Sequence, residues 1–296
     1  MQPPVPISST APSTSRSRFA WQRFFTQTAL GRILLAAIAA AAIVTGYFWY
    51  TRYRGTGWSQ NFNFVLMYRL SRGEDLYRSG DAMLLHGNRK LPEVAITFDD
   101  GPHPTSRPLI LDTLKRYGVH ATFFDVGINM ERRPALVQRT LAEGHEMANH
   151  TYHHLRLTDL SPAERRREIN DPDITFCAIT NRHLKLMRPP GLRYNPAVLA
   201  EARALGYVTV NYTTAAKDAD AMDPAAPEVI AERTLGRVEN GTILLLHDYP
   251  GTAEALPTIL EALRSRGYRC VTVTEMLEHL PEPARSEASK QLAAAP

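Results

Sequence analysis

The stretch VAITFDDGP, residues 94–102, decides the fold. An apolar run ends in two adjacent carboxylates, Asp99 and Asp100, and Gly101-Pro102 then turns the chain. A short apolar run bounded by a turn is typical of a buried strand. Because neighbouring side chains of an extended chain point in opposite directions, one carboxylate can bind a metal while the other faces a substrate. A plain turn capped by an aspartate is the alternative.

The same kind of apolar run recurs along the chain. The further predicted strands are 121–127, 145–150, 184–190, 207–213, 242–248 and 270–276. Segments with helical spacing lie between them, at 105–117, 132–143, 162–170, 196–205, 227–237 and 252–267. Strands that alternate with helices predict parallel β/α units. We therefore expect an α/β fold, a deformed (β/α) barrel with about seven parallel strands, preceded by one N-terminal transmembrane helix. No G-x-G-x-x-G follows the first strand, which counts against dinucleotide binding.

The N-terminal part predicts a membrane segment. ILLAAIAAAAIVTGYFWY, residues 33–50, carries no charge, and the first 54 residues contain six arginines and no acid. Such a run can cross a bilayer, and the preceding arginines predict a cytoplasmic N-terminus. A cleavable signal peptide is the alternative. With either, the rest of the chain is expected on the periplasmic or extracellular side of the cytoplasmic membrane.

These patterns divide the chain into five expected parts. They are a disordered cytoplasmic tail (1–28), the anchor (29–50), a juxtamembrane entry segment (51–90), the catalytic domain (91–280) and a disordered tail (281–296). The net charge of +4 reflects the basic flank of the membrane segment and gives little support to nucleic-acid binding. Cys177 and Cys270 are the two cysteines, and we favour two free thiols over a disulfide.

Ionisable residues fall at several of the predicted strand ends. NHTYHHLRL, residues 149–157, places His150 and His154 four residues apart. Two histidines and one carboxylate form a common zinc set, and Asp99 or Asp100 can supply the carboxylate. His153 is expected to point away from such a site. Because the carboxyl ends of strands in a β/α barrel meet on one face, these groups are expected to form one site.

Two further strand ends offer an arginine and a histidine. Arg188 precedes two prolines that stiffen the backbone, and its guanidinium can clamp the aspartate that is not on the metal. His247, in LLLHD, could protonate a leaving group. The alternatives are an exposed loop arginine and a histidine buried in the core.

Together, TFDDGP, HTYHH, RPP…N and LLLHD resemble the motifs of the polysaccharide deacetylases of the NodB-like type, carbohydrate esterase family four, over about residues 90–278. The resemblance implies hydrolysis of acetyl groups from sugars with a divalent metal, typically zinc. The implied metal ligands are Asp100, His150 and His154. Asp99 is the implied general base, Arg188 orients it, and His247 is the implied general acid.

Other implied roles fall where the chain departs from the family pattern. Asp218 aligns with the aspartate that pairs with the catalytic histidine, although Ala215 and Ala219 replace neighbouring family residues. RPPGL stands where the family often has Arg-Pro-Pro-Tyr-Gly, so an aromatic wall is lost. The implied substrate-binding residues are Pro190, Gly191 and Leu246, with Leu246 lining the slot for the acetyl methyl.

Three functions remain open from the sequence. The first is a metal-dependent N-deacetylase of an extracytoplasmic N-acetylhexosamine glycan, peptidoglycan or an exopolysaccharide. The second is a deacylase or deformylase of a lipid-linked sugar, and the third is a glycan-binding homologue that has lost catalysis. The expected partners are the glycan and the membrane, with no nucleic acid and no partner protein.

Overall fold

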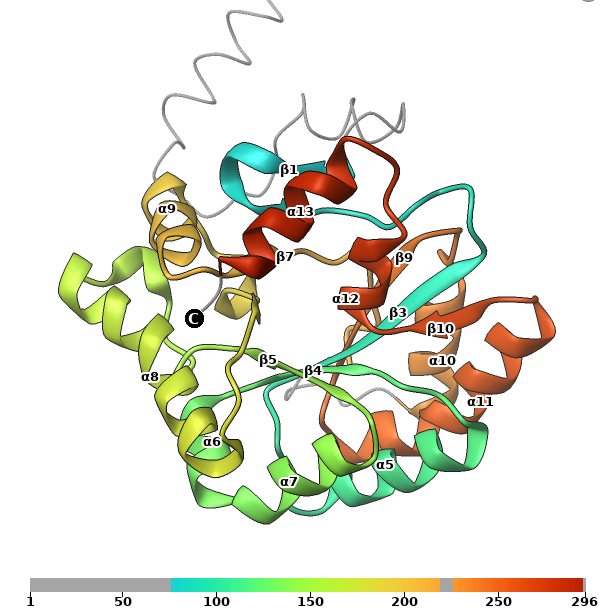
Figure 1. Cartoon of the computed structure of the whole chain (residues 1–296). Helices are drawn as coiled ribbons and strands as arrows, with labels where there is room; N and C mark the ends of the chain where they lie inside the picture. Colours follow the sequence, from blue (N-terminus) through green and yellow to red (C-terminus); the bar gives the residue numbers. More distant parts are fainter. Residues whose placement is uncertain (1–75, 219–225, 295–296) are drawn as a thin grey trace, which may run out of the picture. The chain divides into compact units, whose positions relative to one another are not determined.

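The structure, a computed structural model, describes residues 76–218 and 226–294. Its centre is one curled sheet surrounded by helices (Figure 1). The seven strands expected from the sequence are present. They are Glu93–Asp99 (β3), Thr122–Asp125 (β4), Glu146–Asn149 (β5), Leu186–Met187 (β6), Val208–Val210 (β7), Thr242–His247 (β9) and Arg269–Val271 (β10).

The sheet has the order β1-β2-β7-β6-β5-β4-β3-β9-β8, and β10 pairs with the first half of β3. Three further short strands are Tyr77–Arg78 (β1), Met83–Leu84 (β2) and Thr214–Ala215 (β8). The first two form an antiparallel hairpin at the edge of the sheet, within the expected entry segment, and β8 lies outside the predicted strands. All pairs are parallel except β1 with β2. The fold is therefore a parallel-rich α/β half-barrel, which agrees with the deformed barrel predicted from the sequence. The sheet includes β1 and β2, so the folded domain begins before residue 91, where the catalytic domain was expected to start.

The helices follow the expected segments with some changes. Those on the sheet's outer side are Ser106–Tyr117 (α5), Gly127–Arg132 (α6), Pro134–Ala142 (α7), Pro162–Thr180 (α8), Pro196–Ala204 (α9), Pro227–Leu235 (α10) and Pro250–Ser265 (α11). The single helix expected at 132–143 is in fact the end of α6 followed by α7. They are separated at Arg133, because the residue before a proline disfavours the helical region.

Two expectations for the C-terminal part are wrong. The strand expected at 270–276 ends at Val271, and Val273–Glu278 forms helix α12. Thr272 caps this helix, and Glu275 bonds back to the Thr272 backbone. This capping box is a helix-start signal that the strand pattern concealed. The disordered tail expected at 281–296 instead contains helix α13, Ala284–Ala293, whose Ala288 is buried in the core.

Side chains along β3 alternate between the two faces of the sheet, and this alternation separates two cores and sets the direction of the strand-end groups. Val94, Ile96 and Phe98 pack outward with helices α5 and α11. Ala95 packs inward, in a cluster that α12 and α13 also enter. Since successive side chains alternate between faces, Asp99 points inward as Ala95 does. The inner face of the half-barrel is therefore where the strand-end groups meet.

Within the described residues no helix has the length and apolar character that crossing a bilayer requires. The predicted segment at 29–50 lies outside these residues, as does the tail expected at 1–28. Cys177 and Cys270 are free thiols, as favoured above, and burial raises the pKa of Cys270 to about 11.

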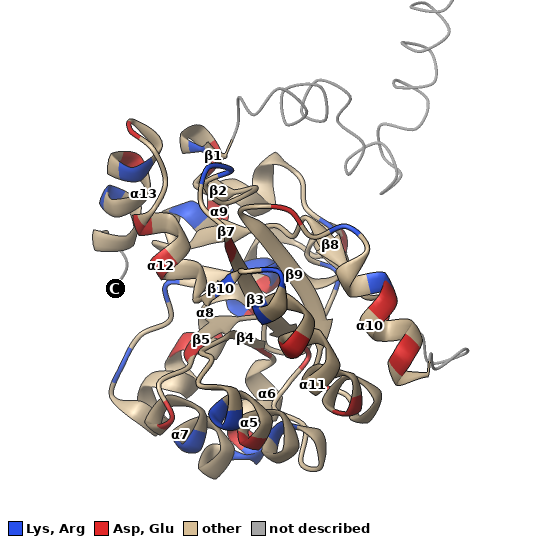
Figure 2. Cartoon of the chain, turned by 90° about the vertical axis from the view of Figure 1, so that its right-hand side faces the viewer, with Lys and Arg blue, Asp and Glu red and all other residues tan. Residues whose placement is uncertain are grey.

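Charged side chains of both signs are interspersed on the outer helices. Figure 2 shows Lys or Arg beside Asp or Glu on α5, α10 and α13. A nucleic-acid surface usually carries a continuous basic stripe. The mixed pattern on these helices does not resemble such a stripe.

Candidate active site and metal centre

Three ligand atoms converge where β3 and β5 end. The Oδ1 atom of Asp100 lies 3.4 Å from Nε2 of His150 and 3.2 Å from Nε2 of His154. All three atoms lie within 4.8 Å of one another. Asp100 Oδ1 is buried and has no hydrogen-bond donor. A buried acceptor without a donor is costly, and a cation would satisfy it. The residues thus fit a divalent metal with histidine and carboxylate ligands.

The protonation tendencies of this cluster agree with a cation site. Burial alone would raise the pKa of Asp100, but its contacts with His150 and His154 outweigh burial and lower that pKa strongly. The close approach of the Asp100 carboxylate raises the pKa of His154. The carboxylate therefore favours a positive partner at the point where the two imidazoles meet.

Main-chain contacts hold the ligands in place. Nδ1 of His150 lies 2.7 Å from the carbonyl oxygen of Arg188. An N–H at Nδ1 can donate to that carbonyl, which leaves the Nε2 lone pair for the metal. Asp100 and His154 both have positive φ, 69° and 60°. Such a conformation is uncommon for residues other than glycine and clusters at functional sites. The Asn129 side chain donates to the Asp100 carbonyl at 3.0 Å and helps to hold this turn.

Arg188 fixes Asp99 beside the metal ligands. Its Nη1 donates to Oδ1 of Asp99 at 2.6 Å and to Oγ1 of Thr97 at 2.9 Å. Other guanidinium nitrogens donate to the carbonyls of Val210 and Asn211 at 3.2 Å. The guanidinium is buried and lies 4.1 Å from the centre of the Phe124 ring. The other Asp99 oxygen, Oδ2, is 3.7 Å from Nε2 of His150 and faces the metal ligands.

Asp218 fixes His247 on the other side of the site. Its Oδ1 lies 2.8 Å from Nδ1 of His247, and its Oδ2 accepts the His247 backbone N–H at 2.7 Å. Thr252 donates a third hydrogen bond to Asp218, at 2.6 Å. Burial alone would lower the pKa of His247, but the hydrogen bond and charge of Asp218 outweigh it and raise that pKa to about 8. A raised pKa favours the protonated imidazole, the form that a proton donor needs.

His153 faces away from the ligand set, as expected. Its Nδ1 lies 2.6 Å from Oε1 of Glu168, and its backbone N–H donates to Oε2 at 2.9 Å. Glu168 lies on α8, so this pair ties the histidine loop to that helix. The structure thus separates His153 from His150 and His154.

The substrate-binding residues implied by the resemblance have different environments. Gly191, with φ of 57°, is exposed, and Pro190 before it is buried. Leu246 was expected to line the acetyl slot, and this was wrong. It packs in the outer core with Ile96 and Phe98, because it and His247 point to opposite faces of β9. Leu245 lies on the same face as His247.

Tyr249 is a site residue that the sequence did not reveal. Its hydroxyl donates to Oδ2 of Asp100 at 3.2 Å. Its ring stacks beside His247, with centroids 5.9 Å apart and planes inclined by 16°. Burial and the Asp100 carboxylate raise the pKa of Tyr249 to about 12. The dipeptide His247-Asp248 drew attention to this segment, but no pattern pointed to the tyrosine.

A buried ion triad beneath the site was also missed. Arg107 bonds Asp125 at 2.5 Å and Asp248 at 2.8 Å, and all three side chains are fully buried. A side chain at Gly101 would collide with all three, so only glycine fits there. Asp125 ends β4 and lies inside the predicted strand 121–127, and this position was the available signal. The triad packs against Gly101, which follows Asp100, and includes Asp248, which follows His247, so it connects the two segments.

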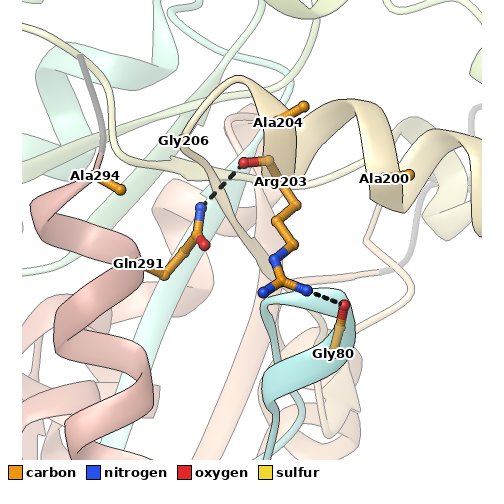
Figure 3. A pocket seen from close by; sticks show the side chains of 7 residues that line it. All are labelled: Gly80, Ala200, Arg203, Ala204, Gly206, Gln291 and Ala294. Atoms are coloured by element: carbon orange, nitrogen blue, oxygen red, sulfur yellow. Dashed lines mark hydrogen bonds between the residues drawn. The ribbon is translucent and has the colours of Figure 1, made fainter.

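A separate cavity of about 390 Å³ lies between α9, α13 and the turn after β1 (Figure 3). Its lining residues are Gly80, Ala200, Arg203, Ala204, Gly206, Gln291 and Ala294. The polar groups there bond each other: Arg203 donates to the Gly80 carbonyl at 2.6 Å, and Gln291 donates to the Arg203 carbonyl at 3.2 Å. This cavity includes none of the predicted site residues.

Comparison with known proteins agrees with this arrangement. Residues 86–210 match the family described as polysaccharide deacetylase. The chain is 40% identical over 190 residues to a peptidoglycan-N-acetylglucosamine deacetylase of Bacillus cereus, covering 63% of this chain and 88% of that protein. The chain belongs to the polysaccharide deacetylase family. The resemblance noted in the motifs is thereby confirmed.

Other members of the family differ in length and in activity. The peptidoglycan-N-acetylglucosamine deacetylase PgdA of Listeria monocytogenes is 33% identical, over 68% of this chain and 44% of that protein. The Bc1960 peptidoglycan N-acetylglucosamine deacetylase has a TM-score of 0.63 and 32% identity, over 66% of this chain and 92% of that one. BA3943 of Bacillus anthracis, described as a CE4 family pseudoenzyme, also has a TM-score of 0.63, with 26% identity over 67% of this chain and 69% of that one.

Proposed function

We propose that this polysaccharide deacetylase removes N-acetyl groups from an N-acetylhexosamine glycan, with peptidoglycan as the first substrate to test. The observation that carries the proposal is the convergence of Asp100, His150 and His154, with Asp99 and His247 beside them. The names of the Bacillus and Listeria relatives support the choice of peptidoglycan. Two imidazoles and one carboxylate suit zinc better than magnesium or calcium, which prefer oxygen ligands.

The site residues can share the hydrolysis between them. A bound divalent metal would supply Lewis-acid polarisation of the amide carbonyl. Asp99, held by Arg188, would take a proton from the attacking water. The backbone N–H of Gly191 would donate to the oxygen that gains charge.

His247 would complete the reaction on the leaving group. Its Nδ1 is engaged by Asp218, so the proton for transfer is at Nε2. As the carbon–nitrogen bond breaks, that proton would pass to the departing nitrogen. The acyl carbon keeps the oxygen from water and leaves as acetate, and the sugar keeps a free amine.

The test is acetate release from purified peptidoglycan, with mass analysis of the sugar products. The proposal predicts that the wild type releases acetate, that a chelator stops the release and zinc restores it, and that Asp99→Asn lowers it by about 100-fold or more. An acyl-sugar panel that includes lipid-linked and formylated sugars distinguishes the second function. Zinc binding without turnover on any member of the panel would instead support a glycan-binding protein that has lost catalysis.

We also propose that the catalytic domain acts outside the cytoplasm, held by an anchor at residues 29–50. The uncharged run at 33–50 and its arginine flanks support this. Protease added to intact spheroplasts should then digest the domain while leaving cytoplasmic markers whole. Protection of the domain under these conditions would exclude the proposed location.

A further inference from the structure

Tyr249 lies between the two sides of the site. We call Asp99, Asp100, His150, His154 and Arg188 the metal-base side, and His247 with Asp218 the acid side. Tyr249 follows His247 by two residues and begins the turn into α11. Its side chain contacts both a predicted metal ligand, Asp100, and the predicted acid, His247.

The hydroxyl contact distinguishes the two oxygens of Asp100. Oδ2 accepts from Tyr249, whereas Oδ1 faces Nε2 of both His150 and His154. A carboxylate that is free to rotate can exchange its two oxygens or offer both to a cation. A donor fixed on Oδ2 sets the rotation and leaves Oδ1 as the ligand atom. Hydrogen bonds of this kind to ligating groups typically change metal affinity about 10- to 100-fold.

The ring contact restricts the imidazole. The Tyr249 and His247 rings are nearly parallel at 5.9 Å, within the range of offset stacking. Asp218 fixes Nδ1 in the plane of the imidazole, and the tyrosine ring lies beside its face. Together these contacts leave His247 few orientations other than the observed one.

We propose that Tyr249 is a positioning residue for the deacetylase site: its hydroxyl holds the Asp100 carboxylate for the metal, and its ring holds the His247 imidazole. The inference rests on the proposed function for the role of His247. The part of the inference that concerns Asp100 predicts metal binding alone and does not require turnover. One side chain thereby fixes the spacing between the metal ligand and the proton donor.

The first test is zinc affinity, measured on the full-length protein by competition with a chelating indicator. Tyr249→Phe keeps the ring and removes the hydroxyl, so zinc should bind about 10-fold or more weakly than to the wild type. Tyr152→Phe is the matched control. Its hydroxyl donates to Glu131 at 2.6 Å, outside the ligand set, so the same loss should leave zinc affinity unchanged.

The second test follows the ring through the His247 imidazole signals in NMR spectra of the zinc-loaded protein. Tyr249→Phe should leave the His247 signals close to their wild-type positions. Tyr249→Leu should shift or broaden these signals and should have a lower kcat than Tyr249→Phe. Unchanged zinc affinity in Tyr249→Phe would overturn the hydroxyl role, and unchanged His247 signals in Tyr249→Leu would overturn the ring role. A wild type that binds zinc but releases no acetate would reject the proposed function and leave the affinity comparison readable.

Discussion

On the metal-base side a buried cation holds a carboxylate, and on the acid side a buried carboxylate holds an imidazole. Arg188 bonds Asp99 at 2.6 Å, and Asp218 bonds His247 at 2.8 Å. The charges are reversed, in keeping with the opposite proposed tasks of taking and giving a proton. Opposite partners thus let the same end of the sheet hold a carboxylate suited to act as a base and an imidazole suited to act as an acid.

The two pairs also differ in how they are built into the fold. Arg188 spans the inner face of the half-barrel and donates to groups on β3, to the last residue of β7 and to the residue after it. Asp218 receives its bonds from His247 and Thr252, close together at the end of β9 and the start of α11. We therefore expect substitution of Arg188 to lower both stability and catalytic activity. Substitution of Asp218 should act mainly on the pKa and orientation of His247.

The largest expected effect comes from removing the metal ligands. His154→Ala should abolish stoichiometric zinc binding and reduce acetate release to background, since only two ligands remain. Zinc content after dialysis and acetate release measure this. Full activity of His154→Ala with one bound zinc would show that the ligand set is misassigned.

Asp99→Asn should remove the base while keeping the shape of the side chain. We expect kcat to fall by about 10² to 10⁴, the usual contribution of a positioned acid or base. Zinc content should stay near one per chain, because Asp100 is the proposed ligand. If zinc is lost and the residual activity is high, the roles of Asp99 and Asp100 would have to be exchanged.

Arg188→Met should destabilise the protein, because it leaves the buried Asp99 carboxylate without its cation. Losing one partner of a buried ion pair costs about 3–5 kcal/mol in the free energy of unfolding. Denaturant unfolding measures it, and Arg182→Met is a matched exposed control expected within about 0.5 kcal/mol of wild type. An equal effect of the two substitutions would contradict the structural role of Arg188.

His153→Ala should have the smallest effect on the site. Zinc binding should remain, because His153 contacts Glu168 and not the ligands. Stability should fall by roughly 1 kcal/mol, the typical worth of a lost hydrogen bond. A loss of zinc as great as that in His154→Ala would mean that the histidine loop is arranged differently.

The sequence predicts the repeating part of this fold well. The seven parallel strands and the segments between them follow from apolar periodicity, because burial on both faces of a strand leaves a strong local pattern. The pattern fails at residues 270–276, where CVTVTEM resembles a strand although Thr272 and Glu275 form the capping box that begins a helix. It also fails at α13, whose single fully buried side chain, Ala288, leaves almost no apolar signal.

The site divides in the same way. The strand-end positions of Asp99, His150, Arg188 and His247 could be predicted because parallel strands present their ends on one face. Leu246 could have been excluded from the sequence alone, since alternate residues of a strand face opposite sides. The contacts of Tyr249 and of the Arg107 triad depend on how a loop folds over the strand ends, and local sequence does not specify them.

The pH dependence of kcat/KM in the wild type and in Asp218→Asn tests the acid side of this account most directly. His247 acts as a proton donor, so activity should fall as pH rises through its pKa, which Asp218 holds near 8. In Asp218→Asn the opposing effect of burial remains, so this basic limb should move down by about one to two pH units, roughly 1.4 to 2.7 kcal/mol. An Asp218→Asn profile with its basic limb at the wild-type position would contradict the claim that Asp218 keeps His247 protonated for catalysis.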